Sequence, residues 1–213
     1  PENEMFATVN WADLPRTVPV GRFNLPAGKT LSCKAELRDL FGKITPLAAP
    51  EVSGGTYELA VQMPTVPQGD YFVDYQLTSP EGTEYWGSYG VAVRAELPTI
   101  DKIQMAEVMY QPTAPFFADV RLSAAPPPGL ILRARGFDRV GREIFRVDRP
   151  ATREVVPVGA DLERTVGMAH HLRAELWQGD RCVDVAREEF LVTAREDPLW
   201  ANIIWGDPIN TLL

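Results

Sequence analysis

Apolar side chains recur at every second residue along several segments, and this period of two constrains the fold more than any other feature of the chain. Successive residues of a β-strand point to opposite faces of a sheet, so such a row predicts a strand with one buried face. The rows are Tyr57, Leu59, Val61 and Met63; Tyr71, Val73, Tyr75 and Leu77; Phe116, Ala118, Val120 and Leu122; and His170, Leu172, Ala174 and Leu176.

Segments rich in glycine and proline separate the rows, as expected of turns between short strands. Examples are Ser53-Gly54-Gly55, Pro80-Glu81-Gly82 and Gln178-Gly179-Asp180. Short strands at this spacing predict antiparallel sheets that keep one face in water. The best helical candidate is residues 97–109, where Pro98 and the apolar spacing leave the assignment open between helix and strand.

The two halves of the chain resemble each other at an offset of about 99 residues. Asp39 and Gly42 correspond to Asp138 and Gly141, and a strand row follows each pair at the same offset. An Asp that caps a turn through its side chain, followed by a Gly with positive φ, closes a hairpin. We therefore expect one fold built twice, with both aspartates acting as turn residues.

These patterns predict an all-β chain of two tandem immunoglobulin-like or fibronectin type III-like antiparallel β-sandwiches, each of about seven strands. The expected domains are residues 1–97 and residues 98–196. Residues 197–213 carry Trp200 and Trp205 in an apolar run. This run predicts a linker strand or the start of a following domain. The chain begins with Pro1 rather than Met, so we expect a processed chain or a piece of a longer one.

Composition limits the classes of partner. The 213 residues contain 21 Lys and Arg against 29 Asp and Glu. The resulting net charge of −8 disfavours binding to nucleic acid or to an anionic membrane. No apolar run is long enough to predict a membrane span. Two cysteines are too few for a disulfide framework. By alternation, Cys33 should be buried and Cys182 should face outward with Asp184.

The sequence contains none of the common catalytic motifs, and we expect no catalytic residue, no metal site and no cofactor. A Gly-x-Ser-x-Gly elbow, a phosphate-binding glycine loop and a zinc-binding His-Glu-x-x-His helix are all missing. His170 and His171 are neighbours on a predicted strand, so their side chains point to opposite faces. We expect His170 to be packed in the core. No two of the many acidic residues are singled out as the pair that glycoside hydrolysis requires.

Aromatic residues near predicted hairpins are the candidates for ligand binding. They are Tyr85, Trp86 and Tyr89 at one hairpin and Trp177 at another. A flat aromatic face can stack on a sugar ring, so carbohydrate contact is one interpretation. Packing in the core or in an interface is the other, since aromatic side chains dominate both.

Two hairpin segments and two strand ends carry a resemblance to a known family. They are Leu37-Arg38-Asp39-Leu40-Phe41-Gly42, Phe137-Asp138-Arg139-Val140-Gly141-Arg142, Tyr71-Phe72-Val73-Asp74-Tyr75-Gln76-Leu77 and Phe190-Leu191-Val192. With them, the chain resembles the N-terminal accessory β-sandwich region of large bacterial glycoside hydrolases of the β-galactosidase-like kind. The segment Trp200-Ala201-Asn202-Ile203-Ile204-Trp205-Gly206 resembles the entry into the catalytic barrel of such enzymes.

The resemblance implies a non-catalytic accessory region that spaces or supports a following catalytic domain and contacts it within the same protein. A weak sugar contact at Trp86 would fit this role. An extracellular or periplasmic location fits the negative charge. Two alternatives stay open, an interaction or adhesion module of a larger bacterial surface protein and an enzyme in its own right. The sequence that follows Leu213 in the parent protein would distinguish them.

Overall fold

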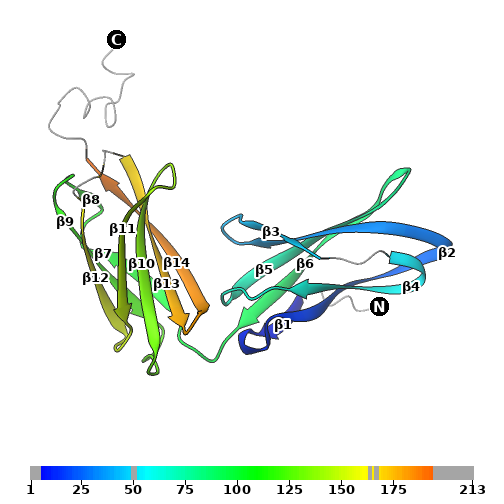
Figure 1. Ribbon diagram of the computed structural model, residues 1–213, viewed down its shortest axis with the longest axis horizontal. Helices are drawn as coiled ribbons and strands as arrows, with labels where there is room; N and C mark the ends of the chain where they lie inside the picture. The colour runs from blue at the N-terminus through cyan, green and yellow to red at the C-terminus, as the bar shows by residue number, and fades with distance from the viewer. Residues whose placement is uncertain (1–5, 49–51, 163–164, 166–167, 194–213) are drawn as a thin grey trace, which may run out of the picture. The chain divides into compact units, whose positions relative to one another are not determined.

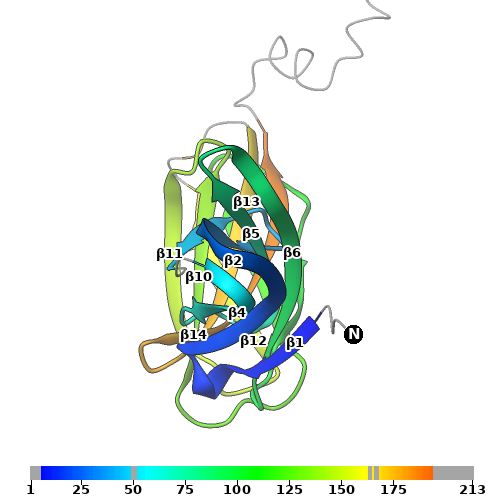
Figure 2. The same cartoon turned by 90° about the vertical axis from the view of Figure 1, so that its right-hand side faces the viewer.

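The computed structural model describes residues 6–48, 52–162, 165 and 168–193. The chain divides into two compact units, Pro1–Glu96 and Leu97–Leu213. Both consist of β-strands, as the ribbon shows from two directions (Figure 1; Figure 2), which confirms the predicted class of tandem β-sandwiches. The described residues hold one 3-10 turn, Trp11–Asp13, and none of their helices could cross a membrane. The expected linker at 197–213 lies outside the described residues.

Unit 1 contains strands β1 to β6. Their bounds are Phe6–Asn10, Arg16–Asp39, Ile44–Leu47, Val52–Met63, Gly69–Ser79 and Gly82–Arg94. The main sheet has the order β1-β6-β5-β2-β3, and β4 pairs with β2 outside this path. Strand β1 runs parallel to β6, and the other strand pairs among the described residues of the unit are antiparallel.

Strand β2 takes part in both layers of unit 1. Its residues 16–31 pair with β4, whereas its residues 32–39 pair with β5. The register of the first pairing shifts between Leu25 and Thr30, where Gly28 has a φ of 80°. Unit 1 therefore has six described strands rather than seven, because β2 runs without a break through the place of two separate strands of unit 2.

Unit 2 contains strands β7 to β14 in two sheets, β11-β10-β13-β14-β8 and β12-β9-β7. Their bounds are Ile100–Met105, Met109–Tyr110, Pro115–Leu122, Leu130–Asp138, Glu143–Pro150, Val155–Asp161, Met168–Gln178 and Arg181–Val192. Residues 97–109, for which the sequence left helix and strand open, contain strand β7 and the start of β8. Ile100 and Ile103 of β7 are buried, and β7 pairs with β9.

The core follows the rows that the sequence predicts. Leu59, Val73 and Leu77 are fully buried in unit 1, and Phe116 is fully buried in unit 2. Phe117, the neighbour of Phe116 on β9, is 54% exposed, as alternation requires. Burial of these rows supplies the main stabilisation, at about 25 cal/mol for each Å² of apolar surface removed from water.

The repeated aspartates close equivalent hairpins, as predicted. The Asp39 carboxylate accepts hydrogen bonds from two backbone N–H groups of the turn that follows it, the nearer from Lys43 at 2.8 Å. Asp138 does the same in unit 2. Gly42 and Gly141 have φ values of 81° and 84°, a conformation that glycine adopts without strain.

Two predictions from alternation near the cysteines are wrong. Cys33 belongs to the inner row but is only half-buried. The register of β13 with β14 shifts by one residue: Trp177 lies opposite Cys182, but Leu176 lies opposite Asp184, so Val183 has no partner on β13. This bulge reverses the phase of the strand. Cys182, which was expected to face outward, is only half-exposed, and Asp184, which alternates with it in the sequence, faces the interior and is 9% exposed.

Candidate functional site

Trp86 and its two tyrosine neighbours lie on opposite faces of β6. Trp86 is opposite Gln76, whereas Tyr85 and Tyr89 are opposite buried residues of β5. The three aromatic side chains that the sequence places at one hairpin are therefore not one cluster, since adjacent strand residues alternate between faces. Only Trp86 lies on the outer face of the sheet, where its side chain is 82% exposed.

A shallow hollow of about 400 Å³ lies beside Trp86 on this outer face. Gln76 on β5 is directly opposite Trp86, and Lys34 on β2 is directly opposite Gln76. The Gln76 amide donates a hydrogen bond to the Thr83 hydroxyl at 2.5 Å. A flat indole, an oriented amide and an ammonium group thus form one row across three strands.

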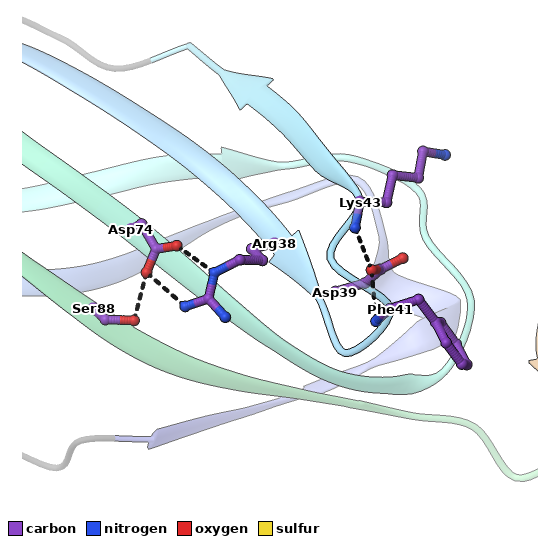
Figure 3. A network of polar contacts seen from close by, with 6 residues as sticks. All are labelled: Arg38, Asp39, Phe41, Lys43, Asp74 and Ser88. Carbon is purple, nitrogen blue, oxygen red and sulfur yellow. Dashed lines mark hydrogen bonds and ion pairs between the residues drawn. The ribbon is translucent and has the colours of Figure 1, made fainter. Parts of the chain in front are cut away.

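The next row on the same face is a charged network (Figure 3). The Asp74 carboxylate accepts hydrogen bonds from Arg38 Nε at 2.7 Å and from the Ser88 hydroxyl at 2.6 Å. The hydrogen bond from Arg38 holds the pKa of Asp74 below its ordinary value, against the opposing effect of partial burial, and Ser88 adds to it. Asp74 is therefore a fixed, ionised acceptor at the edge of the hollow.

Chemically, this arrangement can contact a sugar ring. One face of a pyranose ring exposes C–H groups that can lie on the indole of Trp86, and its rim carries hydroxyl groups. Gln76 and Ser88 offer uncharged polar groups to such hydroxyls. Lys34 and Glu36, joined by an ion pair at 2.7 Å, offer charged ones. A few oriented polar groups around an aromatic surface are typical of a small-ligand site.

Trp177, the candidate in unit 2, already contacts side chains of its own unit. Its ring lies under the guanidinium of Arg133, with the Arg133 Cζ 4.1 Å from the ring centroid. Its Nε1 donates to the Glu175 carboxylate at 2.9 Å. One face and the polar edge of the indole therefore have partners inside the unit, and Trp177 is not equivalent to Trp86.

The outer face of unit 2 also carries a row of four arginines that the sequence did not single out. Arg135 on β10 is opposite Arg146 on β11 and Arg173 on β13, and Arg173 is opposite Arg187 on β14. Three of them have a carboxylate within 4 Å. The Nε of Arg135 is buried and has no hydrogen-bond partner among the described residues. The spacing of Arg133 and Arg135 already placed both side chains on one face of a predicted strand. The sequence did not contain the register between strands that brings Arg146, Arg173 and Arg187 beside them.

The histidines behave as predicted. His170 is 2% exposed and its ring stacks on Phe190, with 5.4 Å between the centroids. His171 lies on the opposite face and stacks on Phe137 at 5.3 Å. Burial lowers the pKa of His171, with Arg187 adding to the effect. Within the described part of the chain, no three His, Cys, Asp or Glu side chains are grouped to hold a metal ion.

The polar residues around Trp86 were also missed at the level of the sequence. Asp74 and Gln76 alternate with the buried row of β5, and Glu36 and Arg38 alternate with that of β2. The sequence therefore did predict that these polar residues lie on the outer faces of their two strands. Their meeting depends on the register between β2 and β5, which no local pattern contains.

Comparisons with known proteins give only distant structural similarity. No protein-family model matches the chain, and no curated protein matches it. An FMN-binding β-glucuronidase from Facaelibacterium prausnitzii L2-6 has 14% identity over 83% of this chain and 31% of its own, with a TM-score of 0.36. A tetra-tandem repeat from the extending region of a large adhesion protein has 12% identity over 77% of this chain and 42% of its own, with a TM-score of 0.34.

A segment of two fibronectin type III domains from chicken tenascin is also similar. It has 9% identity over 80% of this chain and 89% of its own, with a TM-score of 0.33. The chain spans less than half the length of the β-glucuronidase and of the adhesion-protein structure.

Proposed function

We propose that the chain is a non-catalytic accessory β-sandwich region of a larger carbohydrate-active enzyme, and that unit 1 contacts sugar through Trp86. The region would space or support the catalytic domain of a glycoside hydrolase. The observation that carries the proposal is the exposed indole of Trp86 beside the ordered polar groups of β2, β5 and β6.

Two physical features support a binding role for this face. A hollow lined by an aromatic side chain and a few oriented polar groups is typical of a site for a small ligand. The polar groups around it are held by strand pairing and by the Arg38–Asp74–Ser88 hydrogen bonds. A ligand would therefore meet groups that are already ordered, which reduces the entropy lost on binding.

Affinity gel electrophoresis against a panel of soluble polysaccharides, followed by a glycan array, tests the proposal. We expect the chain without substitutions, called the parent in these experiments, to be retarded by at least one polysaccharide. Trp86→Ala should weaken that binding by about tenfold or more, since a stacked aromatic side chain contributes over 1 kcal/mol. Phe117→Ala, which removes an exposed aromatic ring from unit 2, is the matched control and should bind like the parent. Equal binding by all three proteins would remove Trp86 from the proposal.

Hydrolysis by the chain itself is a separate question. We expect the purified chain to leave chromogenic glycosides intact, because the proposal assigns the chemistry to another domain. Turnover above the buffer control that survives further purification would contradict the non-catalytic assignment.

An interaction or adhesion module is the second candidate, and a different observation favours it. Leu40 and Phe41 at the tip of the β2–β3 hairpin are 66% and 64% exposed. Apolar tips of this kind suit contact with another protein. Sedimentation velocity on the parent and on a Leu40→Ser, Phe41→Ser double variant distinguishes this role. Self-association that the double variant loses would favour an interaction module.

A further inference from the structure

One arginine on the outer face of unit 2 has no negatively charged partner. Arg135 on β10 lies between Arg146 on β11 and Arg173 on β13. Neighbouring strands of a sheet are about 4.8 Å apart, so the three positive side chains start close together on one face. Among the described residues, no carboxylate lies within 4 Å of the Arg135 guanidinium.

The other arginines around Arg135 each have a carboxylate of their own. The pairs are Arg146–Glu143 at 2.9 Å, Arg173–Glu175 at 2.7 Å, Arg187–Glu189 at 3.9 Å and Arg133–Asp148 at 3.9 Å. Together with Arg135, this group holds five arginines and four carboxylates. One positive charge is therefore left over, and it belongs to Arg135.

The carboxylates of Glu143 and Glu175 are already held by other donors. Glu143 accepts hydrogen bonds from Arg146 Nε at 2.9 Å and Nη2 at 3.0 Å. These bonds are the main reason why the pKa of Glu143 is below its ordinary value, and the charge of Arg135 adds a smaller effect. Glu175 accepts the Nε1–H of Trp177 as well as its bond from Arg173. Neither carboxylate is thus available to take Arg135 as its main partner.

The surroundings of Arg135 limit the directions that its side chain can take. The residues two positions away on the same face of β10 are both stacked, Arg133 on the ring of Trp177 and Phe137 on His171. The Nε of Arg135 is buried between them and has no hydrogen-bond partner among the described residues. A buried donor without an acceptor costs free energy, which a ligand oxygen would recover.

We propose that Arg135 is the centre of a binding site for a single oxyanion group, a carboxylate or a sulfate ester, on a small acidic ligand. A guanidinium offers its N–H donors in a planar fork that two oxygens of such a group can accept together. Arg146 and Arg173 would add positive charge from both sides. One negative charge would complete the balance of the group and remove the repulsion between the three arginines.

The charge of the whole chain limits the size of the ligand. Its net charge of −8 opposes the approach of a long polyanion, whereas a ligand with one negative group meets mainly the local field. This site lies in unit 2 and does not depend on the sugar contact proposed for Trp86 in unit 1. Failure of either proposal therefore leaves the other unaffected.

Titration of the full chain with three monovalent sodium salts tests the proposal by NMR. The salts are acetate, which carries a carboxylate, methyl sulfate, which carries a sulfate ester, and chloride, which supplies the same ionic strength without the oxyanion. The measurement is the chemical shift of the arginine Nε–H groups and of the backbone amides of β10 and β13. We expect acetate or methyl sulfate to shift the Arg135 signals saturably, with a Kd on the order of 10 mM. Chloride should bind at least tenfold more weakly.

Variants of Arg135 separate specific binding from a general effect of salt. Arg135→Gln should weaken binding at least tenfold, as followed by the backbone amides. Arg135→Lys keeps the charge but lacks the planar fork, so it should weaken binding by about threefold or more. Arg153→Gln, at an exposed site outside the row, is the matched control and should bind like the unsubstituted chain.

The possible outcomes divide clearly. Saturation by acetate alone supports a site for carboxylates, and saturation by methyl sulfate alone supports a site for sulfate esters. The proposal is overturned if chloride produces the same shifts at the same concentrations. It is also overturned if Arg135→Gln binds both oxyanions as tightly as the unsubstituted chain.

Discussion

The carboxylate of Asp138 holds Arg142 twice, accepting its backbone N–H at 2.8 Å and pairing with its guanidinium Nε at 3.0 Å. Burial acts to raise the pKa of Asp138, but hydrogen bonds from Arg142 and Val140, with the Arg142 charge, bring it below its ordinary value. Asp39 closes the equivalent hairpin of unit 1 from a more exposed position.

Loss of these two carboxylates should therefore have unequal effects. Asp138→Ala leaves backbone N–H groups and a guanidinium without their acceptor at a site that is only 1% exposed. At Asp39, water can replace the lost acceptor. We expect Asp138→Ala to lower Tm by at least about 4 °C more than Asp39→Ala does. Differential scanning calorimetry of both variants measures this, and equal losses would contradict the burial argument.

Val73 provides a test of the core of unit 1. It lies at the centre of β5 and is fully buried, so Val73→Asp places an unpaired charge among apolar side chains. We expect it to cost more than about 4 kcal/mol and to unfold unit 1 at room temperature. Gln76→Glu on the outer face of the same strand is the control. Urea unfolding followed by far-UV circular dichroism measures both, and a parental transition for Val73→Asp would show that the strand assignment is wrong.

The outer face of unit 1 should tolerate substitution but lose affinity for sugar. Gln76→Ala removes the amide opposite Trp86 without disturbing the core. If the proposed function is right, we expect glycan affinity to fall by about three- to tenfold, the loss typical of one hydrogen bond. Tm should stay within about 2 °C of the parent value, since surface changes rarely exceed 0.5 kcal/mol. Isothermal titration calorimetry with the polysaccharide found by gel electrophoresis measures the affinity, and differential scanning calorimetry measures Tm.

Asp184 should make unit 2 less stable as the pH rises. Burial raises the pKa of Asp184, although hydrogen bonds from Ile100 and Val185 N–H act the other way. An unfolded Asp has a pKa of about 3.9. The unfolded chain therefore releases this proton first, and the fold loses stability from about pH 4 upward until the folded pKa is passed.

Asp184→Asn isolates this effect, because the amide oxygen can still accept the Ile100 N–H. We expect the variant to gain stability relative to the parent as the pH rises from 4 to 7. Urea unfolding at several pH values in this range measures the difference in free energy of unfolding. A difference that stays constant with pH would exclude Asp184 as its source.

Arg135 should weaken the sheet that contains it. It lies between Arg146 and Arg173, and like charges directly opposite each other are destabilising. We expect Arg135→Thr to stabilise unit 2 by up to about 1 kcal/mol, and by more at low salt than at high salt. Arg153→Thr at an exposed site is the control. Thermal unfolding at two salt concentrations measures both, and a loss of stability at low salt would contradict the prediction.

Local pattern was sufficient for the strands, the core rows and the Asp-x-x-Gly hairpins, because each depends on residues close together in the sequence. It failed where a single inserted residue reverses the phase, as at the bulge that turns Asp184 inward. It also could not separate Trp86 from Trp177. The difference between them lies in Arg133, which reaches Trp177 from another strand. Partners that meet across a sheet depend on register, and register is set by the whole fold.

The parallel pairing of β1 with β6 has a mechanical consequence. Phe6 lies beside Gly90 and Asn10 beside Arg94, so the first and last strands of unit 1 are bonded along five residue pairs with their directions aligned. A force that stretches the unit from its two ends would pull these strands past each other and load their hydrogen bonds together. Bonds loaded in shear resist as a group, whereas a hairpin pulled open at one end gives way one bond after another. Unit 1 should therefore resist a pull along the chain better than a hairpin opened from one end.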